Sequence, residues 1–218
     1  MVHRREINGQ EVLFGNQGDL FNGALTWFDH ETGSVWSQPT GEAILGPRAG
    51  ERLQLLPSQL TTWDAWRSAH PETLALDSMA PRPGFNLASM SIAVDFASGA
   101  VQFSVENLRA VGVANHIVQV GSVELAIAVV IDPADENRWV AFSRQLDDEV
   151  VVELTMAGGV LLDTVTGTTF DPAIGRALDG PLTGQRLDPL PGFTIFPDDF
   201  ERLFPAGHTW NPPTPPGG

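Results

Sequence analysis

The sequence predicts a mainly β fold made of two related units of short antiparallel strands, each with one short helix, around an approximate twofold axis. An internal repeat is the first observation behind this prediction: residues 29–71 align without a gap with residues 163–205. Most shared residues are glycine, proline or turn formers, which determine backbone shape rather than chemistry. The second observation is that short apolar runs alternate with turn residues throughout the chain. The repeat therefore indicates an architecture and no activity.

In each copy, two strands come first. In the first copy the apolar runs 12–14 and 24–28 are separated by Gly-Asn-Gln-Gly-Asp-Leu-Phe-Asn-Gly, which we interpret as a loop. The counterparts 149–154 and 159–162 have a shorter connection. Since elaborated loops often carry function, we expect a ligand cleft to form beside the long loop of the first copy.

An Asp-x-x-Thr-Gly turn follows in each copy, beginning at Asp29 and at Asp163. A carboxylate that opens a tight turn accepts backbone N–H groups two or three residues further on, and glycine takes the positive φ that closes the turn. We interpret both aspartates as turn caps. The alternative is a pseudo-symmetric carboxylate pair for cation binding or acid–base chemistry.

Each copy then continues with a hairpin and ends in a helix. In the first copy the strands are expected at 43–45 and 52–56, around a Gly-Pro-x-x-Gly turn. Thr61 or Thr62 can cap a helix in which Trp63 and Trp66 share one face, and Pro71 ends it. Aromatic residues at this spacing usually anchor a helix on a sheet, so the helix is expected to cover the core.

Four segments divide the chain. They are a first unit that is incomplete at its N-terminal end (1–76), a linker (77–90), a second unit (91–210) and a disordered Pro/Gly tail (211–218). The second unit begins with elements that the first copy lacks. These are a hairpin around 97–100, a short helix near 106–111 and a long apolar strand over 123–131.

Composition excludes several classes of partner. The net charge is −15, from 27 acidic and 12 basic residues, and this negative field opposes nucleic acid and anionic membrane surfaces. Cysteine is absent, which excludes disulfides and thiolate chemistry within this chain. No apolar run approaches the roughly 20 residues of a membrane span, and no secretion signal is visible. We expect a soluble chain.

The candidate ligand-binding residues are Asp29, Ser34, Trp36 and Gln38. They lie where the two copies differ most, since Ser-Val-Trp-Ser-Gln in the first copy is Thr-Thr-Phe-Asp-Pro in the second. Tryptophan offers a flat apolar face and glutamine both a donor and an acceptor. Alternation along a strand would equally place Trp36 in the core. A small-molecule ligand is the expected partner.

Histidine spacing predicts no metal site and no cofactor. The five histidines contain neither His-x-His nor His-Glu-x-x-His; they are His3, His30, His70, His116 and His208. A zinc site assembled from dispersed histidines is the open alternative.

Three motifs in order carry a family resemblance: Asp-x-x-Thr-Gly-Ser-x-Trp-x-Gln, Gly-Pro-x-x-Gly and Trp-x-x-Trp-x-x-x-His-Pro. With them the chain resembles the domain-of-unknown-function family 3179, closely over 5–76 and more loosely over 103–209. The resemblance implies no established reaction, substrate or cofactor. It suggests an extracytoplasmic origin, because many members are exported.

The chain also departs from the family. Members typically carry Cys-Pro-Leu-Cys just upstream of the arginine that aligns with Arg5, and this chain begins after that point. We hypothesise that it is a fragment, which an in-frame stop codon close upstream of Met1 would refute. The expected function is a ligand-binding or structural module that self-associates through an exposed strand edge. The alternative is a metal-dependent or oxidoreductive enzyme whose key residues lie upstream.

Overall fold

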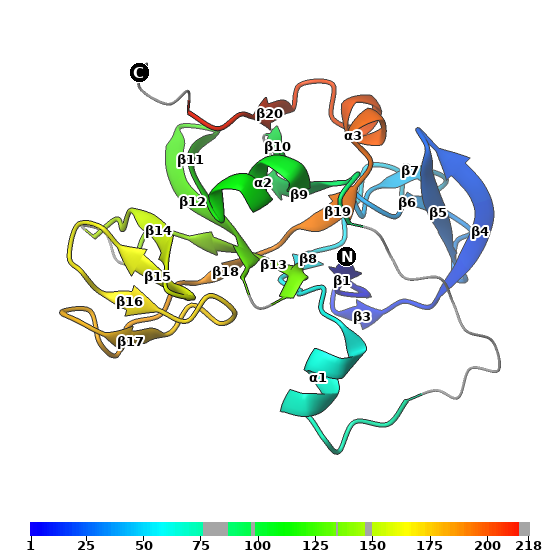
Figure 1. The fold of residues 1–218 in the computed structure, drawn as a ribbon. Helices are drawn as coiled ribbons and strands as arrows, with labels where there is room; N and C mark the ends of the chain where they lie inside the picture. The colour runs from blue at the N-terminus through cyan, green and yellow to red at the C-terminus, as the bar shows by residue number, and fades with distance from the viewer. Residues whose placement is uncertain (76–86, 97–98, 134, 147–149, 214–218) are drawn as a thin grey trace.

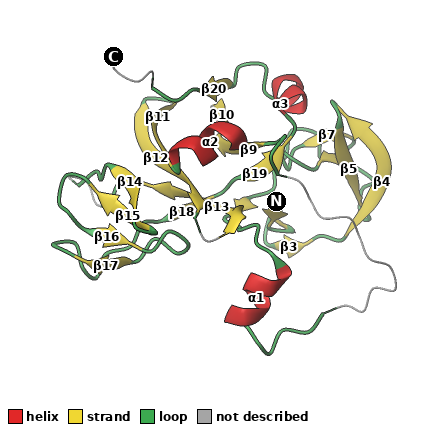
Figure 2. Ribbon diagram, viewed as in Figure 1, coloured by secondary structure: helices red, strands yellow, loops and turns green. Residues whose placement is uncertain are grey.

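The computed structural model describes residues 1–75, 87–96, 99–133, 135–146 and 150–213. It is mainly β, with 48% strand and 10% helix, which confirms the predicted class. The strands form several small sheets, and three short helices lie among them (Figures 1 and 2).

Two four-stranded sheets occupy the middle of the molecule (Figure 1). The first has the order β11 (Val113–Val120), β12 (Val123–Asp132), β13 (Asp135–Ser143) and β18 (Pro189–Leu190). The second has the order β19 (Phe193–Ile195), β9 (Ser91–Phe96), β10 (Gly99–Ser104) and β20 (His208–Trp210). The largest apolar cluster, which includes Phe103, Ile127 and Trp139, takes residues from both sheets.

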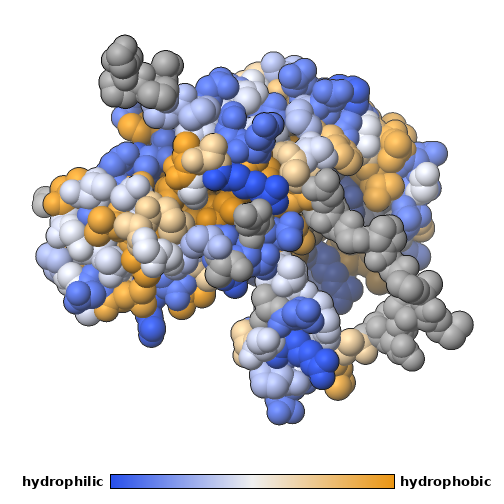
Figure 3. Space-filling model, in the orientation of Figure 1, coloured by the Kyte–Doolittle hydropathy of each residue, from blue (hydrophilic) through white to orange (hydrophobic). Residues whose placement is uncertain are grey.

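Two further four-stranded sheets lie on opposite sides of this middle part and have the same antiparallel strand order (Figure 1). One consists of β4 (Phe14–Phe21), β5 (Ala24–Asp29), β6 (Val35–Ser37) and β7 (Ala43–Leu45). The other consists of β14 (Leu154–Ala157), β15 (Val160–Asp163), β16 (Thr169–Phe170) and β17 (Ala177–Asp179). Each has a register shift at the same place, before Trp36 and before Phe170. Hydrophobic side chains reach the surface on both (Figure 3).

Shorter elements connect these sheets. The remaining strands are β1 (Val2–His3), β2 (Glu6–Ile7), β3 (Gln10–Glu11) and β8 (Leu55–Leu56). The helices are α1 (Trp63–Ala69), α2 (Val105–Val111) and α3 (Pro197–Leu203). The three expected helices and the hairpin of β9 and β10 are thus confirmed.

The long loop expected in the first copy is instead a strand. β4 extends to Phe21 and pairs with β5, with a register shift between Asn16 and Leu20. Asn22 and Gly23 have φ of 51° and 88°, so they form a two-residue hairpin turn. The Asn-Gly pair was the signal for this turn, and counting the preceding glycines as loop formers obscured it.

The second predicted unit contains both helices that were expected in it, α2 and α3. Its strands are antiparallel except that β20, which follows α3, pairs with β10 in the parallel sense. The twofold relation between the units and the proposed division of the chain stay predictions.

The helices of the two copies differ in burial. Phe200 of α3 is 1% exposed and packs with Phe193 and Ala93, so this helix covers the core as expected. Trp63 and Trp66 of α1 are 45% and 42% exposed, and α1 projects from the body (Figure 1).

The expected linker and tail lie partly outside the described residues. The structure does not describe 77–86 or 214–218. Leu87 and Met90, at the end of the expected linker, are buried in the main core.

Candidate functional site

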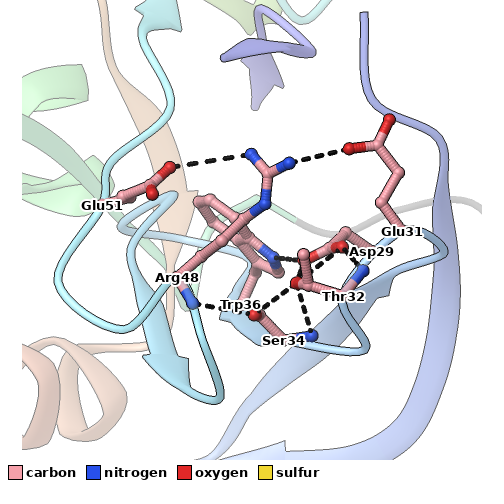
Figure 4. A network of polar contacts seen from close by, with 7 residues as sticks. All are labelled: Asp29, Glu31, Thr32, Ser34, Trp36, Arg48 and Glu51. Carbon is pink, nitrogen blue, oxygen red and sulfur yellow. Dashed lines mark hydrogen bonds and ion pairs between the residues drawn. The ribbon is translucent and has the colours of Figure 1, made fainter. Parts of the chain in front are cut away.

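Asp29 ends β5 and its side chain is fully buried. Its carboxylate accepts the backbone N–H of Thr32 at 2.6 Å and the hydroxyl of Thr32 at 2.9 Å. The indole N–H of Trp36 donates to its second oxygen at 3.0 Å (Figure 4). Both oxygens are therefore engaged within the protein, as the turn-cap interpretation requires.

The hydrogen bonds continue to the next turn. The hydroxyls of Thr32 and Ser34 lie 2.7 Å apart, and Ser34 Oγ accepts the backbone N–H of Arg48 at 3.1 Å. The Arg48 guanidinium lies between two carboxylates, 2.7 Å from Glu31 and 3.7 Å from Glu51 (Figure 4). The side chains of the first Gly-Pro-x-x-Gly turn and of the Asp29 turn thus form one network.

Electrostatics keep Asp29 ionised. Burial by itself would raise the pKa of its carboxyl, but the hydrogen bonds from Trp36 and Thr32, with the nearby Arg48 charge, outweigh burial and lower the pKa. An ionised carboxylate whose oxygens already accept several hydrogen bonds is poorly suited to proton transfer.

The second copy repeats this turn with a different last partner. Asp163 is also fully buried and accepts the backbone N–H of Thr166 at 3.0 Å and its hydroxyl at 2.6 Å. The backbone N–H of Glu153 donates to it at 2.9 Å, and Phe170 occupies the position of Trp36. Burial raises the pKa of Asp163 less than these hydrogen bonds lower it.

The structure brings Asp29, Ser34 and Trp36 together, and all three are 0% exposed. Gln38 is half-buried near them; its backbone N–H donates to Leu25 and its carbonyl lies 2.9 Å from His3 Nε2. Asp29 and Asp163 lie in separate sheets. Ligand contact by the four predicted residues stays a prediction, while the observed contacts give the three buried side chains structural roles.

A cleft lies elsewhere, between residues 57–66 on one side and β13, β18 and the segments that follow β16 and β17 on the other. Its volume is about 320 Å³, and six of its lining residues are Gln59, Trp66, Phe142, Ile174, Arg186 and Leu190. Sequence reasoning missed this site because its walls come from distant segments.

Local contacts position the polar groups of this cleft. The side chain of Gln59 donates to the carbonyl of Ala173, which links the two walls. Arg186 Nε donates to the carbonyl of Ile174 at 3.1 Å. Trp66 stacks on His70 with ring centroids 4.0 Å apart and donates its indole N–H to Thr73 at 3.0 Å. The cleft therefore combines the indole ring of Trp66, whose position is fixed by these contacts, with the guanidinium group of Arg186.

The described residues contain neither a cluster of metal-ligating side chains nor a helix that could span a membrane. Within the described ranges, no three His, Asp or Glu side chains come together in a way that would hold a metal ion. None of the helices in that part of the chain has the length and hydropathy needed to span a bilayer.

Comparison with known proteins gives one match. No curated protein and no solved structure matches the chain. A family model does match, over residues 1–86, and its description is "Protein of unknown function (DUF3179)". This confirms the resemblance noted from the motifs that begin at Asp29, Gly46 and Trp63. Residues 1–86 thus resemble the DUF3179 family of proteins of unknown function.

Proposed function

We propose that the protein is a non-catalytic ligand-binding module whose cleft between α1 and the second unit takes a small aromatic carboxylate. The observation that carries this proposal is the combination of apolar walls and one guanidinium in the same cleft. Trp66, Phe142 and Leu190 supply the apolar surface, and Arg186 supplies the cation. Sites of this kind hold a ligand by apolar burial and orient it by a few polar groups.

The internal repeat supports a ligand role for Arg186. Its counterpart Arg52 makes the same bond from Nε to a backbone carbonyl, here that of Thr40 at 3.0 Å. Arg52 also forms an ion pair with Asp95. Arg186 forms no ion pair with a carboxylate in the part of the chain that the structure describes. Its planar guanidinium is therefore available for a carboxylate on a ligand.

The chemistry of the lining supports binding rather than catalysis. The residues that line the cleft include no histidine, aspartate or glutamate, so the groups most used in acid–base catalysis do not face a ligand there. Ser58 and Thr61 are the hydroxyl residues of the lining, and neither has a base among the other lining residues.

Fluorescence of 8-anilinonaphthalene-1-sulfonate, an aromatic anion, tests the proposal with the folded chain. We expect saturable enhancement at about one dye per chain, reversed by aromatic carboxylates. Trp66→Ala and Arg186→Gln should each weaken dye binding at least about fivefold, which corresponds to about 1 kcal/mol. The matched controls are Trp63→Ala, an exposed tryptophan of the same helix, and Arg176→Gln, whose backbone pairs with that of Arg186. Equal loss in the controls would contradict the proposal.

The edge of the β4–β7 sheet favours self-association as a second role. β4 is an edge strand of that sheet, and its residue Leu20 is 65% exposed. An apolar edge strand can pair with that of another chain. Light scattering at increasing concentration should show a dimer that Leu20→Lys weakens. A monomer at every concentration would refute this role.

A further inference from the structure

Two histidines that are 92 residues apart in the chain lie in contact. His116 is in β11 and His208 begins β20, and their Nε2 atoms are 2.9 Å apart. Their ring centroids are 5.2 Å apart and the planes are inclined by 54°. The strands belong to different sheets that meet at one end of the molecule (Figure 1).

The surrounding structure holds both rings in place. His208 is fixed by the pairing of β20 with β10, opposite Val101, and His116 by the pairing of β11 with β12, opposite Ile127. Beneath the pair, fully buried Phe103 meets His116 edge to face at 6.1 Å. The pair can be reached from solvent, because His208 is exposed and His116 is half-buried. The pair is therefore both ordered and accessible.

The spacing suits coordination of one ion by both rings. Metal–imidazole bonds are about 2.0–2.1 Å long, so two such bonds at a right angle place the nitrogens about 2.9 Å apart. A tetrahedral angle would require about 3.3 Å. Square-planar or tetragonal sites with nitrogen ligands are typical of Cu²⁺ and Ni²⁺, and Cu²⁺ binds most tightly in the divalent series.

We propose that His116 and His208 form a bidentate site for a divalent transition-metal ion, with preference for Cu²⁺ and with water in the remaining positions. The geometry carries this proposal. The net charge of −15 also attracts cations. A bound ion would link β11 to β20 and so stabilise the contact between the two middle sheets.

Calorimetry and electron paramagnetic resonance with Cu²⁺ test the site. The protein should carry no affinity tag, and every form should carry His3→Gln, since a histidine near a free amino terminus is an independent copper ligand. We expect one Cu²⁺ per chain, coupling to two imidazole nitrogens and an increase in Tm. His116→Ala and His208→Ala should each lower the affinity at least about tenfold.

A control separates this pair from other histidines. His70→Gln, at the residue that follows α1, should leave Cu²⁺ binding unchanged. Folding of each variant is checked by its circular dichroism spectrum. If either alanine variant binds Cu²⁺ as tightly as its parent, or if the spectrum shows no imidazole nitrogen, the proposal is wrong. His116→Gln serves if the alanine variant does not fold.

Discussion

The indole N–H of Trp36 donates a hydrogen bond to the carboxylate of Asp29, and both side chains are completely buried. Trp36→Phe removes this bond and leaves an ionised acceptor with one donor fewer. We expect the free energy of unfolding to fall by about 1.5–3 kcal/mol, measured by urea denaturation. Trp139→Phe is the matched control, because its buried indole N–H has no hydrogen-bond partner among the residues that the structure describes. A similar loss in both variants would show that ring volume dominates.

The two turn aspartates should make the protein sensitive to acid. The pKa values of Asp29 and Asp163 are lowered in the folded protein, so their contribution to stability is present above the ordinary pKa of 3.8 and is lost as the pH falls through the folded values. Asp29→Asn and Asp163→Asn should each lower stability by more than about 2 kcal/mol at pH 7 and much less near pH 2. A loss that is the same at both pH values would contradict this.

Gly46 should not tolerate a side chain. Its φ is +99°, and a Cβ atom there would lie 2.8 Å from Ser34 Cα. Gly46→Ala therefore introduces both conformational strain and a clash with the backbone of Ser34, and each lowers the stability of the folded protein. Gly50 has a similar φ of +89° but open space around it, so Gly50→Ala should cost only about 1 kcal/mol. Thermal unfolding should show a clearly larger drop in Tm for Gly46→Ala than for Gly50→Ala.

Asp95 should produce a pH dependence of the opposite sign. Burial raises its pKa to about 6, against the lowering effect of the ion pair with Arg52. Because the folded pKa is raised, the stabilising contribution is complete below the ordinary value of 3.8 and is lost as the pH rises from there through about 6.

The variant Asp95→Asn isolates this effect. Relative to wild type, the stability of Asp95→Asn should increase between pH 4 and about 6.5 and then level off. Glu201→Gln, which removes an exposed acid on α3, is the matched control. The free energies of unfolding of Asp95→Asn and wild type are compared by urea denaturation across this pH range. If their difference does not change with pH, the ion pair with Arg52 compensates the effect of burial fully.

Local features were predictable from the sequence because their causes lie within a few residues. The Asp-x-x-Thr-Gly turns at Asp29 and Asp163 are examples, since each aspartate bonds the threonine three residues on. The positions of the helices were predictable in the same way, from capping residues and prolines. The spacing of Trp63 and Trp66 predicted that both side chains lie on one face of the helix. It did not predict that this face is exposed, because exposure depends on what packs against the helix.

The cleft and the histidine pair were beyond prediction because distant segments form them. Trp66 comes from α1, Phe142 from β13 and Arg186 from the segment between β17 and β18. His116 and His208 become neighbours only because β20 returns beside β10. Neither arrangement leaves a periodicity or spacing in one sequence.

Because the two turn aspartates have different last hydrogen-bond partners, residues 36 and 170 have unequal freedom to change. Position 36 must supply a donor to Asp29, so few replacements would leave that turn intact. At position 170 the side chain only fills the core, because a main-chain amide, which every residue but proline retains, completes the bonding of Asp163. Mutational drift should therefore be slower at Trp36 than at Phe170.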